Sequence, residues 1–241
     1  QDNPLATMPA GDSAAGKLTV SANPAGEGRL RVMTQNLYLG TDIDPVLEAS
    51  SADQIPGLMA QGWQKVTAND FHARAQALAA EIDLARPHLV GLQEVSLFRM
   101  QVPGDFLLGN PQPATQVALD YLDVMLAALA ERGLDYEAVA VATGIDIEVP
   151  MVASLSPLTL ADLRYTDREV ILARRDLPVS NPQTGQYRAV VPFTVAGQAA
   201  ATPRAWASVD ARWAGQTVRF VSTHLEVEKF APVQEAQGVE L

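Results

Sequence analysis

The spacing of hydrophobic residues along the chain predicts strands that alternate with helices. A stripe at four- and three-residue intervals predicts a helix over about 69–86, which Pro87 ends. A second stripe predicts a helix over about 115–132, with Gly133 as its C-terminal cap. Short alternating or continuous apolar runs predict strands at 30–36, 89–92, 136–142 and 169–173.

The remaining segments carry weaker patterns. Residues 150–162 show no period and are predicted to be irregular, and prolines divide 176–203 into edge-strand fragments. Residues 205–212 and 217–223 alternate on either side of a glycine turn and predict a hairpin. Helices and antiparallel strands thus follow one another without a regular strand–helix–strand rhythm. This order favours an α/β sandwich with the sheets at the centre and the helices outside.

Composition divides the chain into two parts. Residues 1–28 are rich in glycine, proline, alanine and serine and are predicted to be a flexible leader, whereas 29–241 form one domain. No apolar run reaches the roughly 18–20 residues of a transmembrane segment. The chain begins at Gln1, which fits a removed signal peptide or trimming, and we expect a secreted or periplasmic protein.

The charge balance restricts the classes of partner. There are 17 Lys and Arg residues against 28 Asp and Glu residues, so the net charge is −11. This balance excludes coating of nucleic acid by bulk charge, but it permits local binding of a phosphodiester when a metal cation supplies positive charge. The chain has no cysteine, which excludes disulfides, zinc–thiolate sites and cysteine nucleophiles.

Three polar residues stand at the ends of predicted strands, where a sheet holds side chains rigidly: Asn36, Glu94 and His224. Each has an ordinary explanation by itself, namely a turn cap, a surface carboxylate and a structural histidine. Their chemistry also suits one site. A carboxylate binds Mg²⁺, Mn²⁺ or Ca²⁺, a histidine donates or transfers a proton, and an asparagine orients a phosphate without adding charge.

The sequence around these residues resembles a known family. The segments TQNLYLG at 34–40, PHLVGLQE at 87–94 and STHLE at 222–226 follow one another in order. Together they resemble the endonuclease/exonuclease/phosphatase superfamily, whose strands read P-D-I-V-G-L-Q-E and N-T-H-L. Ser222 replaces the usual asparagine of the latter, and DREVILAR at 167–174 is similar to the middle strand of that family. The resemblance extends over about 30–241.

The resemblance implies a DNase I-like four-layer α/β sandwich with mixed, largely antiparallel sheets. It also implies a divalent-metal-dependent phosphoesterase that uses Mg²⁺, or Mn²⁺ or Ca²⁺, for in-line attack by water. By this resemblance His224 and Asn36 are catalytic residues and Glu94 is a metal ligand. Arg168 is a candidate substrate-binding residue because its planar fork suits a phosphate, and a structural salt bridge is its alternative. The substrate stays open between nucleic acid and a phospholipid head group.

Two motifs of the family are missing here. No G-D-F-N and no S-D-H follows His224, so the resemblance implies that the C-terminal part is absent from this chain. We therefore expect a second polypeptide from the same precursor as a partner. The alternatives are a non-catalytic family member that acts as a binding module, or an inactive fragment. Asp146 and Glu148 alternate in one segment, and either one partners His224 or both form a solvated face.

Overall fold

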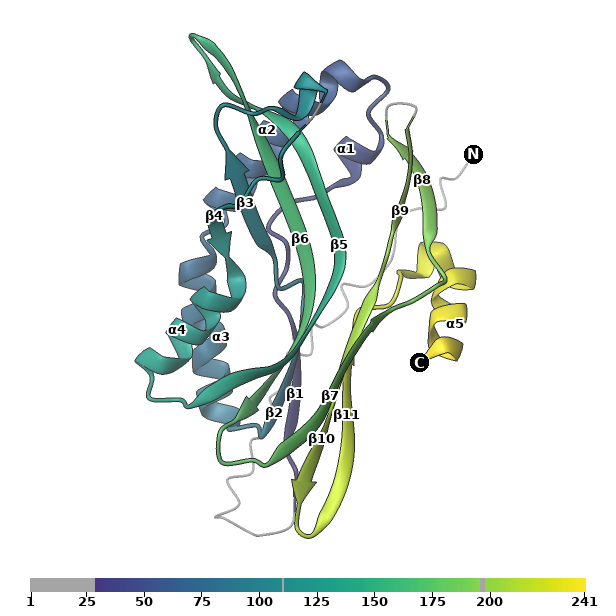
Figure 1. The fold of residues 1–241 in the computed structure, drawn as a ribbon. Helices are drawn as coiled ribbons and strands as arrows, with labels where there is room; N and C mark the ends of the chain where they lie inside the picture. Colours follow the sequence, from purple (N-terminus) through teal and green to yellow (C-terminus); the bar gives the residue numbers. More distant parts are fainter. Residues whose placement is uncertain (1–28, 110, 196–197) are drawn as a thin grey trace, which may run out of the picture.

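The computed structural model describes residues 29–109, 111–195 and 198–241, and the predicted leader at 1–28 lies outside them. Its largest element is a mixed six-stranded sheet (Figure 1). The strands are β1 (Val32–Asn36), β2 (Leu89–Gln93), β6 (Leu158–Arg174), β3 (Leu97–Gln101) and β4 (Gln116–Asp120) in spatial order, and β5 (Tyr136–Leu155) also pairs with β6. The β1–β2 pair is parallel and the other pairs are antiparallel.

A second, antiparallel sheet faces the lower half of the first in Figure 1. Its strands are β7 (Val179–Gln186), β10 (Ala205–Trp213) and β11 (Gln216–Thr223), with β10 in the middle. Buried alanines of β10 pack against apolar residues of β2 and β6 such as Leu89 and Ile171. Small side chains on this inner face let the two sheets approach closely. A separate hairpin consists of β8 (Val191–Val195) and β9 (Gln198–Thr202).

The helices at 55–68, 71–85 and 121–131 pack on the other face of the large sheet, whereas the last helix lies beside β8 in Figure 1. The α-helices are α1 (Asp44–Leu47), α2 (Ile55–Ala68), α3 (Phe71–Ala85), α4 (Tyr121–Glu131) and α5 (Ala231–Glu240), and the short 3₁₀ helices are η1 (Ala52–Gln54), η2 (Phe106–Leu108) and η3 (Glu228–Phe230). The rings of Phe71 and Tyr121 stack with centroids 3.6 Å apart, which joins α3 to α4 in the main core. No helix in the described part of the chain is long and apolar enough to cross a bilayer.

The predicted fold class is confirmed. The described residues form an α/β structure with mixed, largely antiparallel sheets and with helices outside the large sheet. This arrangement supplies three of the four predicted layers. Val218 and Val221 of β11 are exposed, so the small sheet has solvent-facing apolar positions among the residues described.

Two predicted segments differ from the structure. Residues 150–162 are not irregular, because β5 and β6 form one long hairpin whose pairing continues to Leu155 opposite Leu158. The helix predicted from 115 begins at Tyr121. The five residues before it form β4, and the Asp120 carboxylate caps the helix by accepting from the backbone N–H of Leu122 at 2.8 Å.

Candidate functional site

A bulge in the large sheet positions Glu94. Strands β2 and β3 pair with β6 one after the other, and the step from Leu92 to Leu97 is opposite the shorter step from Val170 to Thr166. The extra residue disrupts the ladder and redirects a side chain. Glu94 takes up this change with a φ of 54°, a conformation that costs a non-glycine residue about 1–2 kcal/mol. Its side chain therefore leaves the ladder at the end of β2.

Asn36 and Glu94 are neighbours, as their positions at the ends of adjacent strands suggest. The Nδ2 of Asn36 donates to Glu94 Oε1 at 2.8 Å, and the backbone N–H of Leu39 donates to Oε2 at 2.6 Å. The Oδ1 of Asn36 in turn accepts from the backbone N–H of Tyr38 at 2.7 Å. Each carboxylate oxygen of Glu94 keeps a further lone pair, so the group is fixed and still able to accept.

Arg74 and Tyr121 hold the loop that contacts Glu94. The guanidinium of Arg74 donates to the carbonyl of Leu37 at 2.5 Å and to that of Tyr38 at 3.2 Å. The hydroxyl of Tyr121 donates to the carbonyl of Leu39 at 3.0 Å. Three successive carbonyls are thus fixed from α3 and α4, and this arrangement aims the Leu39 N–H at the Glu94 carboxylate.

A second group of side chains gathers around β6. Asp167 and Glu169 lie two residues apart on this strand, and His224 follows β11 of the small sheet. One candidate ligand atom from each of these three residues lies within 4.8 Å of the other two. Both carboxylic acids are buried, and Asp167 Oδ1 and Glu169 Oε2 have no hydrogen-bond partner among the residues that the structure describes. The cluster therefore has the composition and the spacing of a metal site.

Burial sets the electrostatics of this cluster. It raises the pKa of Asp167 to about 6 and that of Glu169 to about 9. The charge of Glu94 raises both pKa values further, so Glu94 lies close enough to add to the negative potential. The Arg204 charge lowers both pKa values, but it does not offset the burial. The site is short of positive charge.

Arg204 lies against His224. Its guanidinium pairs with the Glu226 carboxylate through Nε at 2.9 Å and Nη2 at 3.2 Å, and its Nη1 lies 3.3 Å from His224 Nδ1. A guanidinium only donates, so Nδ1 accepts and the ring hydrogen is on Nε2. Burial, followed by the Arg204 charge, lowers the pKa of His224, which favours the neutral ring. His224 thus presents an Nε2–H donor.

Polar contacts join the two sheets beside the site. The Gln93 amide donates to Ser222 Oγ at 3.0 Å and accepts from the Thr34 hydroxyl at 3.2 Å. Gly91 permits this approach, because a Cβ at this position would lie 2.8 Å from Ser222 Oγ. These contacts fix the strand that leads to Glu94 relative to the strand that leads to His224.

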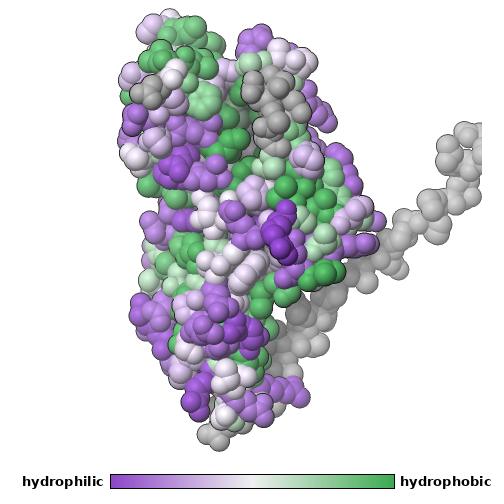
Figure 2. Space-filling view, turned by 45° about the vertical axis from the view of Figure 1, so that its right-hand side comes forward, coloured by the Kyte–Doolittle hydropathy of each residue, from purple (hydrophilic) through white to green (hydrophobic). Residues whose placement is uncertain are grey.

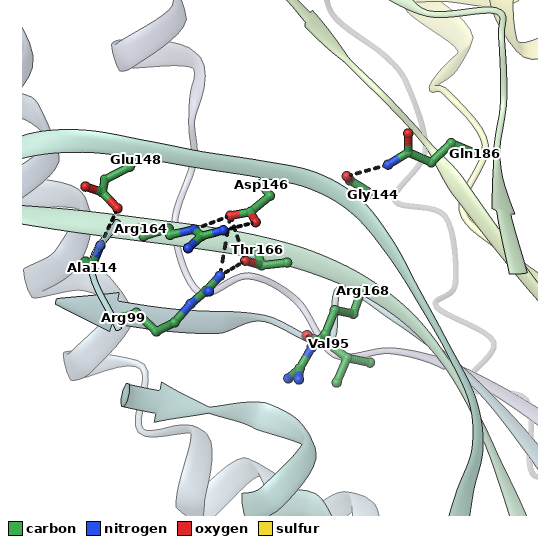
Figure 3. Close-up of polar contacts among 10 residues, drawn as sticks. All are labelled: Val95, Arg99, Ala114, Gly144, Asp146, Glu148, Arg164, Thr166, Arg168 and Gln186. Atoms are coloured by element: carbon green, nitrogen blue, oxygen red, sulfur yellow. Dashed lines mark hydrogen bonds and ion pairs between the residues drawn. The ribbon is translucent and has the colours of Figure 1, made fainter. Parts of the chain in front are cut away.

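Arg168 points away from this centre. Its Nε donates to the Val95 carbonyl at 2.8 Å, and Figure 3 draws these two residues. Its Nη2 lies 2.5 Å from an Asp120 carboxylate oxygen. The side chain is buried, so its position is that of the salt-bridge alternative. Arg168 thus fixes the position of Val95, the residue that follows Glu94 in the bulge. Among the described residues no contact joins the Arg168 side chain to the cluster of Asp167, Glu169 and His224, so its substrate-binding role stays a prediction.

Asp146 and Glu148 do not partner His224. The Asp146 carboxylate accepts from Arg164 Nε at 2.8 Å and from the Thr166 hydroxyl at 3.0 Å (Figure 3). Glu148 accepts from the backbone N–H of Ala114 at 2.7 Å. Both residues lie on β5, and pairing with β6 places them beside other groups of the large sheet.

The sequence did not predict that Asp167, Glu169 and Arg204 lie together beside His224. The spacing of the two acids was a usable signal, because residues i and i+2 of a strand share one face. Acids within an apolar strand run are also unusual unless they serve a site. The proximity of Arg204 to His224 had no such signal, since it depends on how the second sheet packs on the first.

Comparison with models of known protein families finds no match, and comparison with curated proteins finds none either. Among solved structures, an endonuclease/exonuclease/phosphatase family protein from Leptotrichia buccalis aligns at a TM-score of 0.40 and 11% identity, over 88% of this chain and 61% of that one. TDP2 from Caenorhabditis elegans aligns at 0.37 and 14% identity, over 79% of this chain and 38% of that one. A truncated form of TDP2 aligns at 0.36 and 16% identity, over 69% and 45%.

The chain therefore spans less than two thirds of each of these proteins. One of them carries the name of the family that the sequence motifs resemble. Their sequence identities of 11%, 14% and 16% are too low for these structures to assign a chemistry to this chain.

Proposed function

We propose that this chain is a divalent-metal-dependent phosphoesterase that hydrolyses a phosphodiester or phosphomonoester by in-line attack of water. The observation that carries the proposal is the buried pair Asp167 and Glu169, which has unpartnered oxygens and raised pKa values beside His224. Carboxylic acids with perturbed pKa values close to a histidine are typical of catalytic centres. The ordered motifs around Asn36, Glu94 and His224 favour the same chemistry.

The donor set fits a hard divalent cation. Asp167 and Glu169 offer free carboxylate oxygens, and Glu94 adds a third negative charge nearby. Mg²⁺, Mn²⁺ and Ca²⁺ prefer such ligands, and their charge would offset the cost of burying the acids. When bound, such an ion polarises a phosphoryl oxygen and stabilises charge on the leaving oxygen.

The chain's own residues orient and stabilise the phosphate. The Nε2–H of His224 donates to an oxygen that gains charge as water attacks, and Arg204 holds the ring in the required tautomer. The partly exposed Arg204 guanidinium also attracts an anionic substrate. Asn36 keeps the Glu94 carboxylate in one orientation through its 2.8 Å hydrogen bond.

Metal binding tests the proposal directly. Calorimetric titration with Mn²⁺ is expected to detect one site in the wild-type chain and none in Glu169→Gln. Glu137→Gln is the matched control, because Glu137 is a partly exposed residue paired with Arg175 on the rim of the sheet. Wild-type binding that Glu169→Gln leaves unchanged would refute the metal site.

Hydrolysis tests the chemistry. Turnover of bis-p-nitrophenyl phosphate is expected to require Mg²⁺ or Mn²⁺, to stop with EDTA, and to fall at least ~100-fold in Glu169→Gln, since even groups behind a metal ligand contribute 10–100-fold. Metal binding by this chain without turnover would instead support the binding-module alternative.

The role of His224 makes a separate prediction. His224→Gln is expected to lower kcat about 10²–10⁴-fold, the range for a positioned proton donor, while Mn²⁺ affinity stays within about twofold. Loss of Mn²⁺ affinity in this variant would show that His224 is a ligand and not a hydrogen-bond donor to the phosphate.

A further inference from the structure

One end of the molecule carries a group of exposed apolar side chains that contribute to neither core. They come from the loop after β3 and from the turn between β5 and β6. We call this group the apolar tip. Its members are Val102, Phe106, Leu107, Leu108, Leu155 and Leu158. Leu155 is 82% exposed and Leu108 is 80% exposed, so both side chains lie largely in solvent.

Hydrogen bonds hold the two segments of the apolar tip together. The backbone N–H of Gly104 donates to the Leu160 carbonyl at 2.9 Å, and the Asp162 carboxylate accepts from the backbone N–H of Phe106 at 2.9 Å. Gly104 permits this contact, because a Cβ there would lie 2.5 Å from Asp162 Oδ1. Leu160 is two residues from Leu158, which is ~7 Å along a strand. The two segments therefore present one surface.

The figures agree with this placement. Figure 1 draws the turn between β5 and β6 as a projection at the upper end of the molecule, beyond the helices. Figure 2 shows hydrophobic side chains gathered at the same end. Leu155 and Leu158 flank this turn, and both side chains are exposed.

The apolar tip is free of charge in a strongly acidic protein. Residues 149–161 contain no Asp, Glu, Lys, Arg or His, and neither do residues 106–119, although the whole chain has a net charge of −11. Nothing in these two segments attracts an anionic surface, and the acidic body repels one. A partner for the apolar tip must therefore accept leucine side chains without offering them charge.

We propose that the apolar tip docks on the surface of a zwitterionic phospholipid bilayer. Protruding leucines enter the head-group and acyl boundary, where they leave water without needing a shaped pocket. A second copy of the chain is a poorer occupant. A standard protein interface uses roughly 20–30 residues on each side, and the apolar tip offers only six large apolar side chains. The docking is independent of the proposed phosphoesterase activity.

Vesicle flotation tests this docking on the whole chain without any activity measurement. Wild-type protein is expected to float with phosphatidylcholine vesicles at both low and high salt. The double variant Leu107→Asp/Leu155→Asp is expected to partition at least ~10-fold less, because a carboxylate resists transfer to the acyl region. Leu84→Asp is the matched control, since Leu84 is 69% exposed on α3, outside the apolar tip, and should float as wild type does.

Three results would overturn the proposal. One is wild-type protein that stays with the unbound fraction at every phosphatidylcholine concentration. Another is equal loss of flotation in Leu84→Asp, which would mean that any exposed leucine suffices. The third is a dimer in sedimentation velocity that the double variant abolishes, which would identify a second copy as the occupant. Circular dichroism of the variants establishes that the fold is retained, as expected for changes at exposed positions.

Discussion

Glu94 depends on residues that never touch its carboxylate. Arg74 binds the carbonyls of Leu37 and Tyr38, and Tyr121 binds that of Leu39, so the Leu39 N–H stays directed at Glu94. Tyr38 itself has a φ of 56°, a strained conformation that the surrounding bonds maintain. The geometry of the centre is therefore set in part from α3 and α4.

Arg74→Lys tests this support, because a lysine keeps the charge but loses the planar fork. We expect stability to fall by about 1–2 kcal/mol, as for two weakened hydrogen bonds, and Mn²⁺ to bind more weakly because the Glu94 carboxylate is less fixed. Urea unfolding and calorimetry measure the two effects. The control is Arg86→Lys, whose parent side chain pairs with Asp83 near the end of α3 and should change stability by less than ~0.5 kcal/mol.

Glu169 makes the stability of the metal-free protein depend on pH. In the unfolded chain its pKa is near 4.5, and in the folded protein burial raises the pKa to about 9. Between these values the folded state keeps a proton that the unfolded state has lost, so stability falls as pH rises. Asp167, with its pKa raised to about 6, contributes in the same direction at lower pH.

Thermal unfolding in EDTA between pH 5 and pH 9 measures this dependence. We expect the midpoint to decline steadily in the wild type, and to decline much less above pH 6 in Glu169→Gln, whose amide cannot ionise. Glu137→Gln should keep the wild-type slope. A wild-type midpoint that is constant or rises with pH would contradict the protonated, buried state of Glu169.

The sequence predicted which candidate residues stand at strand ends. Asn36, Glu94 and His224 follow apolar runs whose length and alternation mark them as strands. It did not identify Arg204 as a neighbour of His224, because a contact between a residue before β10 and one after β11 depends on hairpin register. The local pattern of residues predicts where strands end, but it does not predict the register between elements.

The two sheets approach each other closely where β2 crosses β11. Gly91 has no side chain at this crossing, and Ser222 fills the space that its Cβ would need. Gln93 then bonds to the same serine, which makes the contact polar and specific. The crossing lies between the strand that leads to Glu94 and the strand that leads to His224.

Gly91→Ala is expected to destabilise the protein by about 1–3 kcal/mol, the usual effect of an added methyl group in a tightly packed contact. Gly57→Ala is the matched control, and its expected effect on stability has the opposite sign. No atom lies within 4 Å of a Cβ at Gly57, and the residue is inside α2, so alanine is expected to stabilise by about 0.5–1 kcal/mol. Chemical denaturation of both variants provides the comparison. Equal effects of the same sign would contradict the close approach at Gly91.

The sequence pattern did not predict the β5–β6 hairpin. Pro150, Pro157 and the surrounding small residues show neither period, so the segment reads as a loop. The base of the hairpin is supported because β6 pairs with β3, as in Leu163 opposite Met100, and beyond that point the backbone N–H of Gly104 donates to the Leu160 carbonyl. Support from a third strand, and not local propensity, decides the conformation here.

The whole molecule combines excess negative charge with a buried acidic centre. A net charge of −11 opposes further burial of carboxylates, yet Asp167 and Glu169 lie in the interior. A cation bound to these two acids, as proposed above, would relieve this conflict and would stabilise only the folded state. Binding at 100 times the dissociation constant adds about 2.7 kcal/mol of stability.

Thermal scans with and without Mn²⁺ test this coupling. We expect saturating Mn²⁺ to raise the wild-type Tm by several degrees at pH 7, and to leave Glu169→Gln unchanged. Glu137→Gln should respond as the wild type does. A rise of equal size in Glu169→Gln would place the stabilising ion elsewhere on the acidic surface.

Strand β6 runs unbroken from the chemical centre to the far end of the β5–β6 hairpin. Nine residues separate Leu158 from Asp167, and at ~3.3 Å per residue they span ~30 Å. A molecule that rests on a bilayer through this end, with β6 along the normal, holds its centre ~30 Å above the interface. Head groups of the lipids beneath it are then out of reach, whereas a polymer or a free solute at that height is not. The distance between the bilayer and the candidate site would thus exclude membrane lipids as substrates and admit soluble ones.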